Sequence, residues 1–427
     1  MKKSQKIISS IVFVVLLTAA IVKCADILEY KEARKKYTPF YESETNFDVI
    51  FLGTSHMWNH VLPMEMWDMY GIASYNWGYS NCTPAENYYL IQDILKYTSP
   101  KVVVMDVYGL TEYDDSHNGK YQTDRIEQQH VQFDSLPVWS LNKAAAAKDV
   151  FDDYDSREDF IWNFIMYHNR WTELGQSDFD YDITTEKGSY FITGLGTGTF
   201  TPIPENEKTE IDSVCYPYYL NLIKYCEEKG IQVLCAYIPF AAGKEQQRIA
   251  NTIGDIVEEY PNCDYINMLT KDILNFDTDL CPDNEHLNYS GARKVTKWLG
   301  RYLSENYKLD DYSGNHSWMS DYQSYYNYKV KTLKEQTTLT DYLVQLEDDD
   351  FVAEAEVYDK KLMNSERLML LYENANIEPE FSATDQKCCA KLKIYSAETK
   401  ERIEEVTFVC DNAKNPDIFH ISKVIEQ

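Results

Sequence analysis

Three residues whose types cooperate in acyl transfer stand at two places that are far apart in the chain. Ser55 follows Gly53 and the apolar run 48–52, whereas Asp283 and His286 lie three residues apart before a predicted helix. A serine hydroxyl becomes a nucleophile when a neutral imidazole takes its proton, and a carboxylate fixes the tautomer of that imidazole. The residue types therefore predict Ser55 as the nucleophile, His286 as the general base and Asp283 as the residue that orients His286.

A purely structural interpretation of these residues remains open. Asp283 and His286 also suit a loop that precedes a helix, since polar residues are common there. The catalytic interpretation gains support from their combination with Ser55, with the glycine at position 78 and with the order of strands and helices between them.

The nucleophile must be positioned by a strand. Residues 48–52 form a continuous apolar run, which is typical of a parallel strand that is covered on both faces. Ser55 then lies at the carboxyl end of that strand, where open α/β sheets bind ligands. Further strands are predicted at 73–77, ending in Gly78, and at 101–107. The pattern predicts an α/β fold with a doubly wound, mostly parallel sheet.

Helices are predicted between and after these strands. Thr83, Pro84 and Glu86 form a capping box with proline at the first helical position, so a helix should begin there. A later helix over 211–229 should end at Gly230. The remaining predicted elements are a strand at 231–238, a helix at 246–260, a short strand at 264–266 and a final helix capped by Ser290.

The motifs resemble those of the SGNH, or GDSL-like, hydrolase family. They are a Gly-x-Ser after the first strand, a glycine loop after the second and an Asp-x-x-His before the last helix. The likeness points to the membrane-anchored surface branch, which includes the D-alanine transfer proteins of teichoic acid and the polysaccharide O-acetyltransferases. It covers roughly residues 48–305 discontinuously, and each short motif needs the others. The resemblance implies a serine esterase or O-acyltransferase that needs no cofactor.

An oxyanion site should accompany the nucleophile. Backbone amides at Ser55 and Gly78 are expected to stabilise the oxyanion. The family usually adds an Asn after the third strand, but Asp106 stands in that region, and an ionised carboxylate donates no hydrogen bond. Asn76 or Asn81 is expected to take over that role. The departure suits the transferase branch better than a plain esterase and also leaves an inactive relative possible.

A stretch of about a hundred residues, 108–211, interrupts the α/β pattern and is too long for a simple crossover. We expect an insertion that folds over the active-site edge. Within it, His168, Arg170 and Trp171 are tentative substrate-binding residues, because similar segments occur in the surface branch; a packed Trp beside a satisfied His is the alternative. The motif Gly194-Leu-Gly-Thr-Gly198 precedes prolines and no helix, so a dinucleotide site is not expected.

The N-terminus carries three lysines before an apolar run at 7–22. Positive charge before such a run places the N-terminus in the cytoplasm and the body outside. We expect a single-pass anchor in the cell membrane over residues 1–25 and a polar stalk over 26–46. A cleaved signal peptide is the rival interpretation, with residues 18–20 as a possible cleavage site.

The remaining boundaries follow from shifts in composition. The catalytic domain should span residues 47–305, a linker and helical segment 306–350, and a small α+β domain 351–427. The last part contains no catalytic constellation, so a structural or carbohydrate-facing role is expected for it.

Composition limits the partners. With 69 acidic and 41 basic residues, the net charge of -28 excludes nucleic acid as a partner, because no basic stripe is present. No metal is expected: the acidic loop 277–288 has Pro282 and Asn288 where a calcium loop needs glycine and glutamate. The expected partners are the membrane, a surface glycopolymer and a membrane-embedded acyl-donor protein. An anchored, catalytically silent binding or assembly protein is the alternative function.

Overall fold

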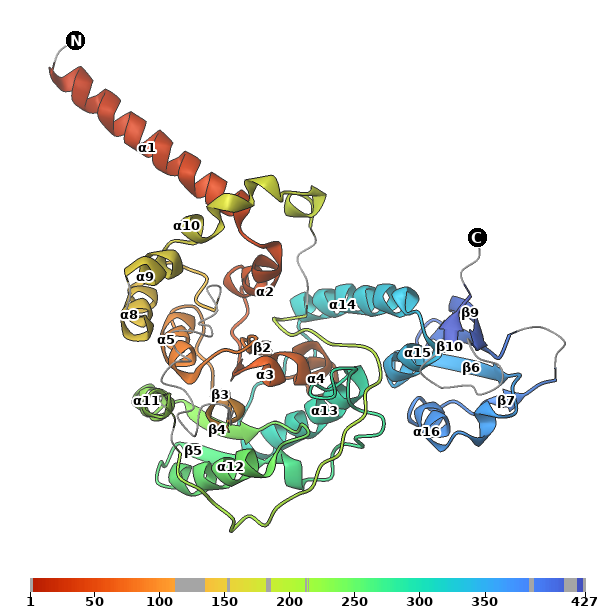
Figure 1. The fold of residues 1–427 in the computed structure, drawn as a ribbon. Helices are drawn as coiled ribbons and strands as arrows, with labels where there is room; N and C mark the ends of the chain where they lie inside the picture. The colour runs from red at the N-terminus through yellow and green to blue at the C-terminus, as the bar shows by residue number, and fades with distance from the viewer. Residues whose placement is uncertain are drawn as a thin grey trace.

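The computed structural model describes residues 3–111, 135–151, 154–181, 186–211, 213, 215–383, 388–410 and 421–424. Figure 1 shows a body built on a parallel sheet, a smaller unit around a second sheet, and a long helix, α1, that projects from the body.

The first sheet has five parallel strands in the order β2-β1-β3-β4-β5. Its strands are β1 (Val49–Leu52), β2 (Ser74–Asn76), β3 (Val102–Asp106), β4 (Gln232–Tyr237) and β5 (Cys263–Asn267). The predicted α/β fold with a mostly parallel sheet is confirmed. Because all five strands run in the same direction, their carboxyl ends share one edge of the sheet, and Ser55 follows β1 at that edge.

Helices cover both faces of this sheet. Val49 and Phe51 belong to one apolar cluster with residues of α13 (Tyr289–Asn306), whereas Ile50 and Leu52 belong to another with residues of α5 (Pro84–Ile94) and α11 (Tyr216–Glu228). The alternation follows from the period of two in a strand. It explains why β1 is apolar at every position.

The helix boundaries mostly follow the predicted capping signals. Thr83 and Glu86 form the capping box of α5, and Gly230, at φ +71°, follows α11. The cap of α13 differs from the prediction: Asn288, and not Ser290, accepts the hydrogen bond from the Gly291 amide. Helix α12 (Lys244–Val257) lies between β4 and β5.

The N-terminal segment is helical. Helix α1 (Lys3–Leu28) is long and apolar enough over Ser4–Leu28 to cross a membrane, which suits a single-pass anchor or a signal sequence. The segment 26–46 is no free stalk, because α2 (Lys31–Tyr41) packs into the body with Lys36 and Phe40 buried. Lys36 Nζ donates to the carbonyl oxygens of Gly78 and Gly188, so α2 is attached to loops of the body.

The insertion divides into two parts. Its first described part contains α6 (Tyr108–Thr111), α8 (Leu141–Val150), α9 (Tyr154–Ile161), α10 (Asn163–Tyr167) and the 3-10 helices η2 (His168–Thr172) and η3 (Gln176–Asp178). Helix α8 packs on α5 and α9, while α10 and η2 contact α1. The second part, residues 186–198, has no regular structure and runs beside the carboxyl edge of the sheet. Among the described residues, this second part and Tyr108 of α6, whose ring centre lies 4.0 Å from that of His56, approach the expected active site.

Two helices link the body to the second sheet. They are α14 (His316–Glu335) and α15 (Leu339–Leu346). The mixed sheet has the order β10-β9-β8-β6-β7. Its strands are β6 (Phe351–Val357), β7 (Glu380–Phe381), β8 (Ala390–Ser396), β9 (Arg402–Cys410) and β10 (Ile421–Lys423). Helix α16 (Glu366–Asn374) lies between β6 and β7 in the chain.

A buried ionic network fastens α14 to the body. The ammonium group of Lys329, which is fully buried, lies 3.0 Å from Glu65 of α4 (Pro63–Tyr70) and 2.8 Å from Asp348. Arg293 of α13 contacts the other oxygen of Glu65 at 2.7 Å. Each buried charge therefore has an opposite charge beside it, as burial requires.

Candidate active site

The structure brings Ser55, His286 and Asp283 together. Nε2 of His286 lies 2.8 Å from Oγ of Ser55, and Nδ1 of His286 lies 2.8 Å from Oδ2 of Asp283. Because an ionised carboxylate only accepts, we assign the proton of the neutral ring to Nδ1. Nε2 is then free to accept the proton of the serine hydroxyl, which is the arrangement that a general base needs.

Ser55 is held by the turn that precedes it. It is the first residue of α3 (Ser55–His60), and Thr54 caps that helix by accepting from the His56 amide. The Thr54 hydroxyl donates to Asp106 Oδ2 at 2.9 Å. A Cβ on Gly53 would lie 2.4 Å from the Cβ of Asp106, so only glycine lets the turn approach β3 this closely. Gly53, Thr54 and Asp106 together fix the position of the first turn of α3, which carries Ser55.

Asp106 is therefore a support of the nucleophile turn. It is fully buried, and burial raises its pKa to about 6, although hydrogen bonds from Thr54 and the Tyr108 amide oppose that rise. Sequence analysis considered Asp106 only as a carboxylate that cannot donate a hydrogen bond to an oxyanion. Its role as an acceptor beneath the turn depends on the register of β1 against β3, which no local sequence signal reveals.

Asp283 is held ionised by its own loop. Burial disfavours the charge, but hydrogen bonds from the Cys281 thiol and from the amides of Glu285 and His286 outweigh it, so the pKa of Asp283 lies below its ordinary value. The same contacts fix the orientation of the carboxylate. Asp283 thus remains an acceptor for Nδ1 of His286 across the physiological pH range.

Two further histidines of α3 lie against the triad. His60 Nε2 accepts from the Leu287 amide at 3.0 Å, so α3 carries the nucleophile at its start and a support for the His286 loop at its end. The ring of His56 lies 5.1 Å from that of His286, and both of its nitrogens lack a partner among the described residues. Burial, followed by the neighbouring histidines, lowers the pKa of both His56 and His60, so both rings are neutral. Sequence analysis missed these residues, although their i, i+4 spacing places them on one helix face.

The expected oxyanion donors are mostly engaged elsewhere. The Gly78 amide donates to Asn76 Oδ1 at 2.8 Å, and Asn76 Nδ2 donates to the carbonyl oxygens of Met57 and Val61. Asn76 therefore acts as a brace between the second loop and α3, which differs from the expected donor role. The Ser55 amide lies in the first turn of α3, where amides have no intrahelical acceptor, and is the donor best placed for an oxyanion.

Residues 186–198 support the His286 loop. The Gly196 amide donates to Leu280 O at 2.7 Å, and the Thr197 amide donates to Asn284 Oδ1. A Cβ on Gly196 would lie 1.8 Å from the carbonyl oxygen of Cys281. The glycine motif of the insertion thus permits close backbone packing against the loop that carries Asp283.

The tentative substrate residues lie at the base of α1. Arg170 donates to Leu28 O and to Asp178, and its guanidinium lies 3.8 Å from the ring centre of Tyr30. His168 and Trp171 are exposed on the same 3-10 helix. The described contacts of Arg170 run to the end of α1 and its neighbours, and the substrate-binding role of these three residues stays a prediction.

The site itself is open. The side chains of Asp283 and His286 are 47% and 18% exposed, respectively. The described part of the insertion leaves the Asp283 edge in contact with solvent. Residues 112–134 of the insertion lie outside the described part, so our expectation that the insertion folds over the active-site edge stays a prediction.

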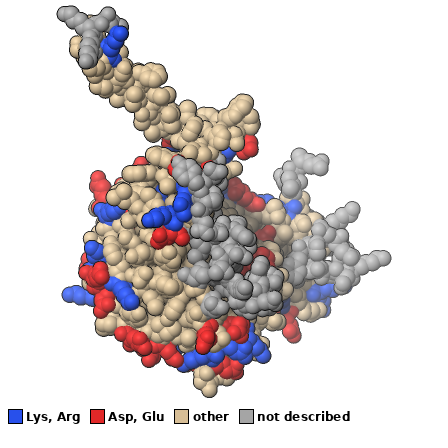
Figure 2. All heavy atoms as spheres, turned by 60° about the vertical axis from the view of Figure 1, so that its left-hand side comes forward, with Lys and Arg blue, Asp and Glu red and all other residues tan. Residues whose placement is uncertain are grey.

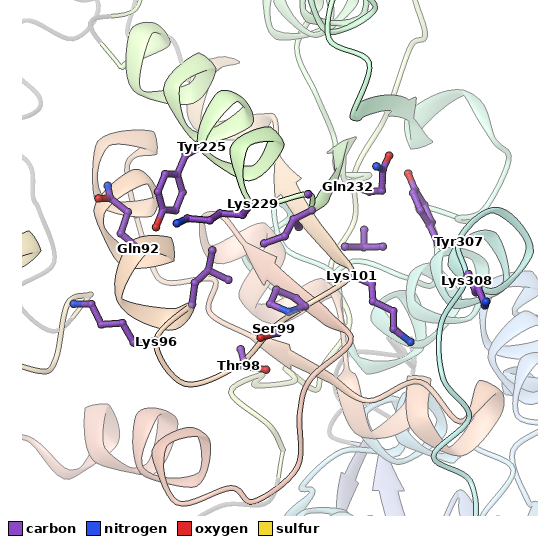
Figure 3. A pocket seen from close by; sticks show the side chains of 15 residues that line it. Gln92, Lys96, Thr98, Ser99, Lys101, Tyr225, Lys229, Gln232, Tyr307 and Lys308 are labelled. Carbon is purple, nitrogen blue, oxygen red and sulfur yellow. The ribbon is translucent and has the colours of Figure 1, made fainter.

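A cleft of about 660 Å³ lies at the opposite edge of the sheet (Figure 3). It is lined by residues that precede β3 and begin β4, and it contains four lysines: Lys96, Lys101, Lys229 and Lys308. Lys101 pairs with Asp48 and Asp310, while two other lysines follow the carboxyl ends of α5 and α11, where cations complement the helix dipole. Helix geometry therefore accounts for this basic lining, and the cleft is remote from Ser55.

No group of three or more His, Cys, Asp or Glu side chains that suits a metal ion occurs among the described residues.

No protein-family model matches the sequence, and no curated protein matches it. Nine chains of solved structures do match. One of them, described as "a putative platelet activating factor from Streptococcus pneumonia", is 10% identical, covers 68% of this chain and 98% of that chain, and has a TM-score of 0.33. A likeness this distant does not establish a family or an activity for this chain.

Proposed function

We propose that this protein is a membrane-anchored, SGNH-type serine enzyme that carries an acyl group as an ester on Ser55. The acyl group then passes to a hydroxyl of an extracellular polysaccharide or teichoic-acid-like polymer. The observation that carries the proposal is the continuous hydrogen-bonded relay from Ser55 through His286 to Asp283, with both links at 2.8 Å.

The relay supports a two-step reaction. Oγ of Ser55 attacks the acyl carbonyl while Nε2 of His286 takes the hydroxyl proton, and Asp283 stabilises the resulting imidazolium. The Ser55 amide donates to the developing oxyanion. When the intermediate collapses, His286 returns the proton to the leaving group and the acyl-enzyme remains. An acceptor hydroxyl then repeats the sequence in reverse.

The acceptor decides between transfer and hydrolysis. The apolar helix α1 and the resemblance to the surface branch favour a polymer hydroxyl as acceptor and a membrane-embedded protein as acyl donor. The 47% exposure of Asp283 favours water and is the reason to keep an esterase as the second candidate.

Turnover of a soluble aryl ester tests the chemistry. Ser55→Ala should abolish turnover in the full-length protein, whereas Ser80→Ala, a half-buried serine of the neighbouring loop, should not. Loss of a triad member typically costs several powers of ten in rate. Equal, measurable turnover in the wild-type and Ser55→Ala proteins would refute Ser55 as the nucleophile, whereas no turnover in the folded wild-type protein would favour the silent binding protein.

Analysis of the surface polymer tests whether the enzyme adds ester groups to it or removes them. Deletion of the gene should lower the ester content of a surface polymer, and the wild-type protein, but not Ser55→Ala, should restore it. A gain of ester on deletion would identify a hydrolase. An unchanged ester content would favour a binding or assembly role.

A further inference from the structure

Seven large apolar side chains between residues 138 and 179 of the insertion are exposed. They are Val138 (38%), Trp139 (56%), Leu141 (79%), Trp162 (49%), Ile165 (38%), Trp171 (69%) and Phe179 (64%). We call this set the apolar collar. Single exposed apolar residues are ordinary on a soluble surface, but a concentration of large ones marks a contact with a partner or a membrane.

The distribution of tryptophan shows that exposed apolar side chains are concentrated in the collar. The chain has eight tryptophans, and the three that are exposed all belong to the collar. The other five are Trp58, Trp67, Trp77, Trp298 and Trp318, which are buried or half-buried. Trp139 and Trp162 stack on each other with ring centres 6.3 Å apart, so two segments of the insertion present one aromatic surface.

The collar segments α10 and η2 are attached to α1 where that helix leaves the body. Helices α10 and η2 contact α1, and Tyr30 packs edge-on against Tyr167 at 5.3 Å. The described side chains of α1 are exposed up to Cys24 and begin to be covered at Ala25. Figure 1 shows α10 and the neighbouring 3-10 segments beside the lower end of α1, and Figure 2 shows the helix above them as an almost uncharged rod.

We propose that the apolar collar is a membrane-docking surface that lies in the interfacial layer of the bilayer crossed by α1. Tryptophan is enriched at the membrane-water interface, because its ring is largely apolar while its N–H still finds water or headgroups. The part of the collar on α10 and η2 contacts α1 where the exposed length of that helix ends, which is where this interface must lie if α1 crosses the bilayer.

The net charge of the chain favours docking on lipid through apolar side chains over docking through charged ones. The chain has a net charge of -28, so anionic headgroups repel the body as a whole. Docking through a basic patch is therefore disfavoured, and burial of apolar side chains is the remaining attraction. Docking should accordingly occur on neutral phosphatidylcholine.

Docking would fix the height of the active site above the membrane. Helix α2 follows α1 directly in the chain, and its Lys36 donates to the carbonyl oxygens of Gly78 and Gly188. Residues 186–198 in turn pack against the His286 loop, so these hydrogen bonds tie the surroundings of the triad to the base of α1. This inference rests on the proposed anchoring by α1 and is independent of the chemistry at Ser55.

Lipid quenching of tryptophan fluorescence tests the proposal. The full-length protein is reconstituted in phosphatidylcholine vesicles that contain lipid brominated close to the headgroup. Trp139→Phe/Trp162→Phe/Trp171→Phe should lose most of the lipid-dependent quenching that the wild-type protein shows. Trp298→Phe, which changes a half-buried tryptophan of α13, should retain it.

The outcomes separate the possibilities. A carbonate wash first shows whether α1 holds the protein in the vesicles; release would refute the anchor without bearing on Ser55. In retained protein, equal lipid quenching of the wild type and the triple variant would overturn the docking surface and leave a partner protein as its occupant. The single variant Trp171→Phe, at a 69% exposed position, gives the same readout if the triple variant does not fold.

Discussion

His60 shows how a single neutral side chain supports the catalytic base without touching a substrate. Its Nε2 accepts from the Leu287 amide, which directly follows His286. Removing this acceptor leaves a buried amide unpaired, which costs about 1–3 kcal/mol. The loop that carries His286 then loses its fixed position relative to Ser55.

We expect His60→Leu to lower kcat for a soluble ester by up to about 100-fold with little change in KM, because misplacement by about 1 Å can cost that much. His60→Gln, whose side-chain oxygen can still accept from the Leu287 amide, should retain most of the activity. Steady-state kinetics of both variants decides the point. Equal rates in the His60→Leu and wild-type proteins would show that His60 does not hold His286 in position.

Asp106 makes stability depend on pH. Its folded pKa of about 6 lies above its ordinary 3.8, so the folded protein keeps a proton that the unfolded chain releases between these values. Its contribution is therefore present below about pH 4 and is lost as the pH rises to about 6, by roughly 3 kcal/mol for a shift of two units.

Asp106→Asn should remove this dependence, because an amide does not titrate. Denaturant unfolding between pH 4 and 7 should show the wild type losing stability relative to Asp106→Asn as the pH rises. Parallel pH profiles of the two proteins would contradict a raised pKa at Asp106.

At the scale of elements, the glycine motif of the insertion couples that segment to the triad. Gly196→Ala would place a Cβ 1.8 Å from Cys281 O. Because Cys281 O is a backbone atom, the clash can be relieved only if the loop that carries Asp283 and His286 moves. Overpacking of this kind typically costs 1–3 kcal/mol. We expect lower stability and lower ester turnover in Gly196→Ala.

Gly314→Ala is the matched control, because nothing lies within 4 Å of a Cβ at that position. Thermal unfolding and ester turnover of the two variants should differ clearly. Wild-type behaviour in Gly196→Ala would show that residues 186–198 do not hold the His286 loop.

The elements that sequence analysis predicted well are those specified locally. Apolar runs predicted β1 and β3, and the Thr83 capping box predicted the start of α5, because each signal lies within a few residues. The apposition of Ser55 with His286 was predictable from the residue types at two distant motifs and from the family resemblance that links these motifs. The brace role of Asn76 and the packing of α2 depend on contacts between distant segments, which local patterns do not encode.

At the scale of the whole molecule, the buried ionic network joins the body to α14 and the acidic turn before the second sheet. Lys329 is fully buried, and its pKa is raised because Asp348 and Glu65 outweigh the opposing effect of burial. Lys329→Met would leave carboxylates buried beside a methyl group. Breaking such a pair typically costs 3–5 kcal/mol.

We therefore expect Lys329→Met to lower the free energy of unfolding by about 3–5 kcal/mol. Lys331→Met, at an exposed position of the same helix, should stay close to the wild type. Denaturant unfolding of both variants measures the difference. A small loss in Lys329→Met would mean that the carboxylates find other partners and that the network is not a strong link.

Covalent labelling of the full-length protein by a fluorophosphonate, followed by peptide mass spectrometry, tests the central claim most directly. The relay among Ser55, His286 and Asp283 predicts one phosphonyl adduct on the Ser55 peptide, and predicts that the adduct is lost in Ser55→Ala and strongly slowed in His286→Ala. The absence of an adduct on Ser55 in the folded wild-type protein, or equal labelling of Ser55 in His286→Ala, would contradict it.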